Sequence, residues 1–253
     1  MNNFRLVTLD YPKNLVGNET AMKLFIDMIR SKQAGFERTD KNLVTMDSLD
    51  AISTHILIYD TQDIFTPKPV AAMRICYENR TKRHNQLLPI EKYSKALPPE
   101  GIQRLATFKE NKPILVDCNA WFVDPGYTFS KSGLALSDLA FFSTILFIMR
   151  KKFNHVAGCT NERYKASRWA NHIGNIVEPV MFIHPSVPDP HRLMLIDGFS
   201  QDWLLQCFDK YRGIINNIFE VTPKAVFIEE PLLSVNDVYE KLKMGDRQTW
   251  TAA

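Results

Sequence analysis

The sequence has few of the residues that most often reveal a site by themselves. Only four cysteines occur in 253 residues, and no two of them form a Cys-x-x-Cys pair. This spacing favours buried thiols in a reducing compartment. The six histidines show no metal-ligand spacing, although His184 and His191 flank a proline-rich loop and could approach each other. We therefore expect no metal.

The sequence also lacks a leader-like segment, a long apolar run and a strong net charge. Its first residues contain no basic segment followed by an apolar one, so no secretory signal is expected. The most apolar run, residues 134–149, is short and interrupted by serine, threonine and aspartate, which does not suit a membrane span. A formal net charge of +3 does not indicate a nucleic-acid partner. The expectation is a cytoplasmic globular protein.

Basic residues nevertheless form two clusters, at residues 80–84 and 150–152. Such clusters are usually solvated faces, and the alternative is a docking surface for an acidic partner. The apolar and charged fractions, 45% and 23%, are ordinary for a globular chain. The length suits one large domain, or one domain with an appendage. We place a main domain at residues 1–198 and a C-terminal helical extension, packed on it, at residues 199–253.

Hydrophobic periodicity predicts a mixture of strands and helices. Strands are predicted at residues 4–9, 55–59, 70–77, 114–123, 155–160, 179–184 and 191–196. Helices are predicted at residues 19–31, near 90–95 and 101–107, and at 134–149, 161–173, 202–219 and 234–244, with a loop or weak helix at 32–50. This order predicts an α+β fold, with a mixed, mostly antiparallel sheet and helices on both faces.

The most informative stretch is residues 113–135. A buried strand leads into the turn Asp124-Pro125-Gly126, and Ser130-Lys131-Ser132-Gly133-Leu134-Ala135 then opens the long apolar helix. Free backbone N–H groups and the positive end of a helix dipole converge at such a point, so it is suited to bind an anion. An ordinary helix start is the alternative.

This arrangement resembles the GNAT-type acyltransferases, whose loop Arg/Gln-x-x-Gly-x-Gly/Ala cradles the pyrophosphate of an acyl-coenzyme A. Gly133 and Ala135 match that loop, while its leading position is Ser130. The family's usual general-acid tyrosine would fall on Ala170 and is missing. The resemblance implies a donor site made of Trp121, Phe122, Val123, Ser130, Lys131, Ser132, Gly133, Leu134, Ala135 and Asn161. For Asn161, a helix N-cap is the alternative.

The first half is similar to the acyl-homoserine-lactone synthases and the related long-chain N-acyl amino acid synthases. Asp47, Asp50 and Arg74 take the positions of their Asp-x-x-Asp pair and strand arginine. Arg30 and Phe36 match an Arg…Phe region in order only, and Leu88-Pro89-Ile90-Glu91 is similar to a Leu-Pro-x-Glu stretch of the amino acid branch. On the central strand, the lactone synthases have Glu-x-Ser-Arg. This chain has Asp117 in place of the glutamate and Ala120 in place of the arginine.

The resemblance implies roles for these residues. Asp117 would take the proton of an attacking amine, and Asp47, Asp50 and Arg74 would bind an amino-acid-like acceptor. Backbone N–H groups around residues 121–123 would stabilise the tetrahedral intermediate. The alternatives are a solvated loop for the two loop aspartates and structural ion pairs for Arg74 and Asp117.

The implied activity is transfer of an acyl group to the amine of a small amino-acid-like acceptor. The donor would be an acyl-CoA or an acyl-carrier-protein thioester, and an acidic carrier would give the basic clusters a role. The apolar helix at residues 134–149 would line an acyl pocket or simply form core. The alternatives are an acetyl-CoA-dependent N-acetyltransferase and a catalytically inactive GNAT-like binding module, because Ser130, Ala120 and Ala170 replace residues that these families use.

Overall fold

The computed structural model describes residues 3–36, 46–63, 65–127, 135–162, 172–184, 189–223 and 231–245. The strands in these ranges form one sheet with the order β6-β7-β5-β4-β3-β2-β1-β8. Their bounds are β1 Phe4–Asp10, β2 Thr54–Asp60, β3 Lys68–Tyr77, β4 Val116–Val123, β5 His155–Asn161, β6 Gly174–Ile183, β7 Pro190–Phe199 and β8 Phe219–Val221. Neighbouring strands are antiparallel except for the parallel pairs β4–β5 and β1–β8. The predicted mixed, mostly antiparallel sheet is confirmed.

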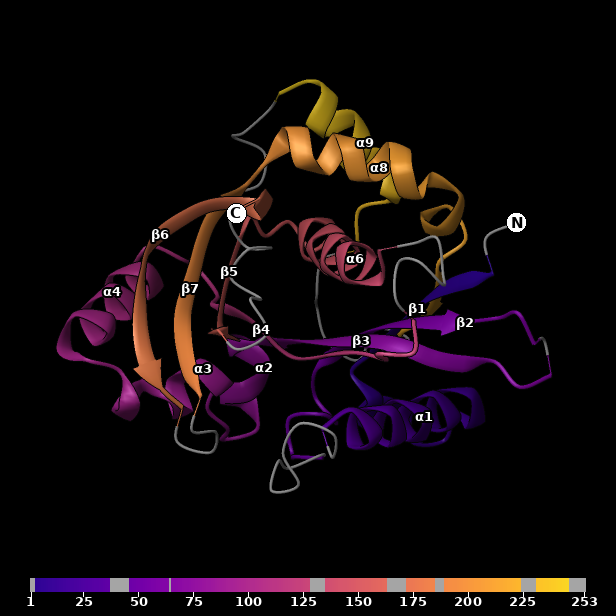
Figure 1. Cartoon of the computed structure of the whole chain (residues 1–253), viewed down its shortest axis with the longest axis horizontal. Coiled ribbons are helices and arrows are strands. Elements are labelled where there is room, and N and C mark those ends of the chain that lie inside the picture. Colours follow the sequence, from indigo (N-terminus) through magenta and orange to yellow (C-terminus); the bar gives the residue numbers. More distant parts are fainter. Residues whose placement is uncertain are drawn as a thin grey trace.

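Helices cover both faces of this sheet (Figure 1). They are η1 Pro12–Leu15, α1 Glu19–Phe36, α2 Glu78–Arg83, α3 Pro89–Lys92, η2 Ser94–Ala96, α4 Pro99–Glu110, α6 Leu136–Arg150, α8 Gln201–Ile215 and α9 Val235–Lys243. In Figure 1, α6, α8 and α9 lie above the strands, while α1, α2 and α3 lie below them. No helix within the described ranges has both the length and the apolar character needed to cross a membrane.

Helix α6 lies between the sheet and the C-terminal helices, which explains why it is apolar on all sides. Leu139 and Phe142 are fully buried, and Leu146 is 1% exposed. The ring of Phe142 packs against aromatic residues of α8, namely Trp203, Phe208 and Tyr211. These α6 side chains therefore form core, in agreement with the simpler of the two interpretations of this helix.

Some element bounds differ from those predicted. Helix α1 continues to Phe36, so residues 32–36 are helical, and α2 follows β3 directly. Of the helix predicted at 161–173, only the two ends lie within the described residues, and β6 already begins at Gly174. The helix predicted at 202–219 ends at Ile215, and β8 follows it. A strand of three residues is too short to show a period, so no pattern predicted β8. The division at residues 198/199 stays a prediction.

The central strand β4 is bent by a β-bulge. Ala72 of β3 is opposite Phe122, whereas Arg74 is opposite Asn119, so Ala120 and Trp121 share the position facing Met73. Ala120 has φ of 52°, in the left-handed region that residues with a side chain seldom adopt. A bulge of this kind turns the strand away from its neighbours.

Strands β4 and β5 separate just before this bulge. Their pairing is limited to Asp117 with Ala157 and Cys118 with Gly158. A Cβ atom on Gly158 would lie 2.6 Å from the carbonyl oxygen of Cys118, so this close approach requires glycine. Beyond it, β4 continues along β3 to Val123 and β5 continues along β7. The separation leaves one side of β4 without a strand partner at the centre of the sheet.

Candidate active site

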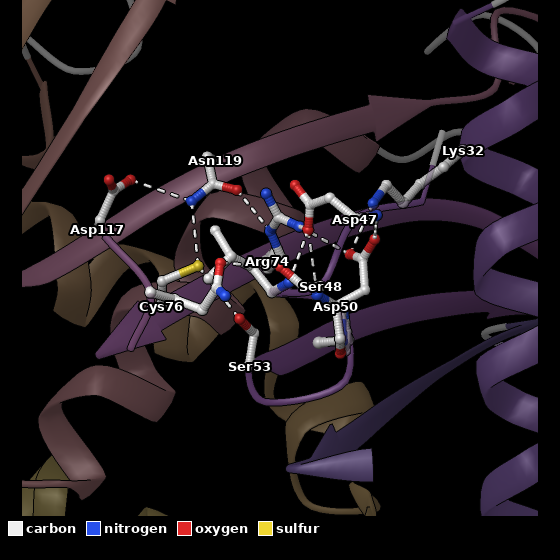
Figure 2. A network of polar contacts seen from close by, with 12 residues as sticks. Lys32, Asp47, Ser48, Asp50, Ser53, Arg74, Cys76, Asp117 and Asn119 are labelled. Atoms are coloured by element: carbon white, nitrogen blue, oxygen red, sulfur yellow. Dashed lines mark hydrogen bonds and ion pairs between the residues drawn. The ribbon is translucent and has the colours of Figure 1, made fainter. Parts of the chain in front are cut away.

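A network of charged and polar side chains centres on Arg74 of β3 (Figure 2). Its Nε donates to Oδ1 of Asn119 on the neighbouring strand at 2.6 Å. Its Nη1 donates to Oδ1 of Asp47 at 2.6 Å and to Oδ1 of Asp50 at 2.9 Å. The three residues predicted as an acceptor-binding group are thus brought together, with Asn119 as a fourth member.

The two aspartates are held by a compact turn ahead of β2. Oδ1 of Asp47 accepts hydrogen bonds from the backbone N–H of Leu49 and of Asp50. In return, the backbone N–H of Asp47 donates to Oδ2 of Asp50 at 3.0 Å. The spacing of three residues allows this reciprocal bonding, so neither aspartate belongs to an ordinary solvated loop. Asp50 is fully buried, whereas the Asp47 side chain is 36% exposed.

Lys32 of α1 completes the charged group. Its Nζ lies 2.7 Å from Oδ1 of Asp50. Arg30, which matches the Arg…Phe region of the resembling family in order only, is exposed on the same helix. Periodicity could have identified Lys32, because it follows the buried positions Leu24 and Met28 at intervals of four residues. The helix continues to Phe36, whose side chain lies outside the described part of the structure.

The electrostatics of Asp50 follow from this crowding. Burial by itself would raise the pKa of Asp50, but the charges of Arg74 and Lys32 outweigh it and hold the pKa below its ordinary value. Burial lowers the pKa of Lys32, and the partner carboxylate opposes that effect. Asp50 therefore stays ionised between two cations, and it fixes the position of the Arg74 guanidinium.

Asp117 lies on β4 and faces the same side of the sheet as Arg74. Its Oδ2 accepts from the backbone N–H of Ile90, in the first turn of α3, at 2.7 Å. Its Oδ1 accepts from Nδ2 of Asn119 at 3.1 Å. Only 1% of the residue is exposed, and burial raises the pKa of Asp117 to about 6. The carboxyl group is thus poised to exchange a proton near neutral pH, which suits a general base.

Asn119 is the residue that joins the two halves of the network. Its amide oxygen accepts from Arg74, while its amide nitrogen donates to Asp117 and to Sγ of Cys76 at 3.5 Å. In sequence it was only the residue two places after Asp117. No pattern marked it, because its importance depends on lying opposite Arg74 across the β3–β4 pair.

The residues predicted for the donor lie around the separation of β4 from β5. The Trp121 ring packs against Phe141 of α6 at 5.0 Å between centroids. Its indole Nε1 is buried and has no hydrogen-bond partner among the described residues. Phe122 points to the other face, against α1 at Gly35, and Val123 pairs with Ala71 of β3. Of these three side chains, only Trp121 places a hydrogen-bond donor that lacks a described partner where β4 separates from β5.

The predicted phosphate loop is described only at its end. Ser130, Lys131, Ser132, Gly133 and Leu134 lie outside the described residues. Ala135 immediately precedes α6, and its carbonyl accepts from the N–H of Leu139. Asn161 is the last residue of β5, and its Nδ2 donates to Oδ2 of Asp189 at 3.2 Å.

The two basic clusters meet although they are far apart in sequence. Nη1 and Nη2 of Arg80 bond to the carboxylate of Asp10 at 2.6 and 3.1 Å, and Lys151 Nζ lies 3.6 Å from the same group. Arg80 is 4% exposed, so its ion pair with Asp10 stabilises the fold. Lys151 follows the C-terminal end of α6, about 24 Å along the helix from Ala135 at 1.5 Å per residue.

His184 and His191 do approach each other, with ring centroids 4.9 Å apart. Across the described ranges, no group of three or more histidine, cysteine, aspartate or glutamate side chains could hold a metal ion.

Comparison with known proteins identifies the fold. No protein-family model and no curated protein sequence matches the chain. Among solved structures, the CoA-dependent acyl-homoserine lactone synthase BjaI with SAM and isopentyl-CoA superposes with a TM-score of 0.57 at 12% identity, covering 95% of this chain and 99% of BjaI. BjaI with MTA gives a TM-score of 0.54 at the same identity and coverage. FeeM, an N-acyl amino acid synthase from uncultured soil microbes, gives 0.47 at 11% identity, covering 78% of this chain and 93% of FeeM.

The chain therefore has a GNAT-type fold. Within that class, its arrangement of sheet and helices is similar to that of the acyl-homoserine lactone synthase BjaI over nearly its whole length.

Proposed function

We propose that this chain is an acyltransferase that moves an acyl group from a coenzyme A or carrier-protein thioester to the amine of a small amino-acid-like acceptor. The observation that carries the proposal is that one nitrogen of the Arg74 guanidinium is left without a partner in the described part of the chain. Its Nε and Nη1 are bonded within the network, whereas Nη2 has no partner among the described residues (Figure 2), and the side chain is 7% exposed. A guanidinium held in one plane with free N–H groups is well suited to bind a carboxylate.

Two features support the donor half of the proposal. A protein of this fold, BjaI, is a CoA-dependent acyl-homoserine lactone synthase whose structure contains isopentyl-CoA. In this chain, β4 has no strand partner on its β5 side beyond Cys118, and the Trp121 Nε1 beside it is a buried donor without a partner among the described residues. Unused donors at this point can bind the carbonyl oxygens of a thioester and of its pantetheine arm. Residues 130–135 would hold the phosphates, and Asn161 would lie near the arm.

In the proposed reaction, the acceptor nitrogen attacks the thioester carbonyl carbon and a C–N bond forms. The nitrogen loses a proton to the Asp117 carboxylate through a water molecule, because Asp117 is buried and its oxygens are already hydrogen-bonded. The intermediate then collapses and the C–S bond breaks. Sulfur leaves as a thiolate, which is protonated from solvent. Asp47 and Asp50 hold Arg74 in place and do not take part in bond making.

The proposal is tested by incubating the purified protein with acetyl-, octanoyl- and palmitoyl-coenzyme A and with the corresponding acyl-carrier proteins. Retained donor is measured by intact-ligand mass spectrometry, and thiol release is measured with each amino acid added. We expect donor retention, and thiol release that depends on an amino acid. Retention of the acetyl donor alone indicates an acetyltransferase, and retention without turnover indicates a binding module. No retained donor of any length would sink the proposal.

Two variants assign the role of Asp117. Asp117→Asn should retain the donor and lower turnover by about 100-fold or more, the usual contribution of a general base. Asp209→Asn, exposed on α8, is the matched control and should leave both unchanged. Turnover by Asp117→Asn equal to that of the control would remove Asp117 from the mechanism.

A further inference from the structure

Tyr93 is a hydroxyl-bearing residue beside the proposed site that the sequence resemblance did not single out. It follows α3, whose Ile90 N–H bonds to Asp117, so the same short helix positions both groups. Its backbone N–H donates to the carbonyl of Pro89, and its ring packs edge-on against His184 at 4.1 Å. The groups whose charges act on its phenol include Cys159, Asp117 and Arg74. The phenol therefore lies near the polar side chains of the site.

The hydroxyl group of Tyr93 is an unused donor. It has no hydrogen-bond partner among the described residues, and Tyr93 is only partly buried. Burial, followed by the charges of Cys159 and Asp117, raises the pKa of Tyr93 above its ordinary value. The phenol therefore keeps its proton and can act only as a neutral hydrogen-bond partner.

We propose that Tyr93 is a second contact for the acceptor carboxylate, and that together with Arg74 it makes the site select amino acids over amines without a carboxylate. This inference rests on the proposed acyl transfer. Arg74 Nη2 and the Tyr93 hydroxyl are donors without partners among the described residues. Tyr93 follows α3, whose Ile90 N–H bonds to Asp117 on the face of the sheet that carries Arg74. A carboxylate has about four acceptor sites on two oxygens, so it can accept from both. Asp117 is then left to accept the proton of the amine through water.

The test is a comparison of Tyr93→Phe with wild-type protein, both saturated with coenzyme A. The variant keeps the ring that packs on His184, so the fold is retained. Calorimetry measures the affinity for each L-amino acid and for the amine formed from it by removal of the carboxyl group, up to about 10 mM. We expect Tyr93→Phe to weaken amino acid binding about tenfold, the usual effect of losing one hydrogen bond to a charged group, and to change amine binding less than twofold.

Tyr239→Phe is the matched control, because its hydroxyl contacts Arg212 between the C-terminal helices, and it should leave both affinities unchanged. Equal weakening of amino acid and amine in Tyr93→Phe, or no weakening of either, overturns the inference. So does a wild-type protein that acylates amines but binds no amino acid, and that result leaves acyl transfer itself standing. A protein that binds amino acids but transfers no acyl group from any donor gives a different result. It overturns the proposed function, while the ratio of the two affinities still decides the role of Tyr93.

Discussion

Lys32 and Asp50 form a buried ion pair that joins the first helix to the turn before β2. Nζ of Lys32 lies 2.7 Å from Oδ1 of Asp50, and the two side chains are 4% and 0% exposed. The pair matters for function because the same Oδ1 also receives Nη1 of Arg74. Its main effect is to fix the guanidinium that we propose binds the acceptor.

Removing Lys32 should destabilise the protein strongly. Lys32→Met leaves a buried carboxylate with one cation fewer, and breaking a buried pair typically costs about 3–5 kcal/mol. Urea unfolding of Lys32→Met and of Lys23→Met, an exposed position on α1, measures the difference. Equal midpoints for the two variants would contradict the importance of the pair. Lys32→Met combined with Asp50→Asn should lose less stability than the two single losses added together, because they remove one shared interaction.

The pH dependence of turnover should show the ionisation of Asp117. Its pKa is raised to about 6, so the basic form needed for catalysis is lost as the pH falls through that value. The acceptor amine must also lose a proton, and this ionisation gives a further pH dependence of log kcat/KM that is the same in both proteins. Below about pH 6, we expect log kcat/KM to fall one unit per pH unit more steeply in wild type than in Asp117→Asn. Parallel profiles for the two proteins would show that another group is the base.

The same ionisation should affect stability with a known sign. The pKa of Asp117 is about 6 in the folded protein, above the ordinary value of 3.8. Its contribution to stability is therefore fully present below about pH 4, and it is lost as the pH rises through about 6. As the pH is raised from about 4 to about 6, the unfolding midpoint of wild type should therefore fall relative to that of Asp117→Asn. A constant difference would mean that Asp117 does not titrate in this range.

The four cysteines should react slowly in the folded protein. Burial raises the pKa of each thiol, to about 12 for Cys159 and Cys207, so little thiolate exists at neutral pH. This predicts direct transfer of the acyl group to the amine, without an acyl-cysteine intermediate. Iodoacetamide at about pH 7 should modify all four only after addition of denaturant, as counted by intact mass. Rapid modification of native Cys159 would reopen a covalent route.

Gly158 should control the separation of β4 from β5. The Cβ of Gly158→Ala would meet the carbonyl oxygen of Cys118 at 2.6 Å, so the strands must shift. We expect a loss of about 1–3 kcal/mol in stability, typical of overpacking, and weaker coenzyme A binding. Gly17→Ala is the control, because no atom lies within 4 Å of its added Cβ. If coenzyme A binds the two variants equally, the width of this separation does not matter for the donor.

Much of the fold follows from local patterns in the sequence. Alternating and continuously apolar stretches predicted β1 to β5 and β7, and the long apolar run predicted α6. Where no period can form, prediction failed: β8 is three residues long, and α2 is a single polar turn and a half. The start of β6 at Gly174 was missed because its pairing with β7 decides it.

The candidate site divides in the same way. Asp47, Asp50, Arg74 and Asp117 could be selected from the sequence because they occupy positions that resemble the pattern of a known family. Lys32, Asn119 and Tyr93 could not, because their partners lie on other elements: Asp50 in the turn before β2, Arg74 on β3 and His184 after β6.

By itself, then, the sequence determined the class of fold and the chemical types available for a site, since both depend on the period and spacing of nearby residues. Only the tertiary structure decided which groups are bonded and which are left open. Whether Arg74 Nη2 and the Tyr93 hydroxyl have acceptors depends on packing between elements far apart in the chain. The pKa of Asp117 likewise depends on burial that only the assembled sheet and α3 produce.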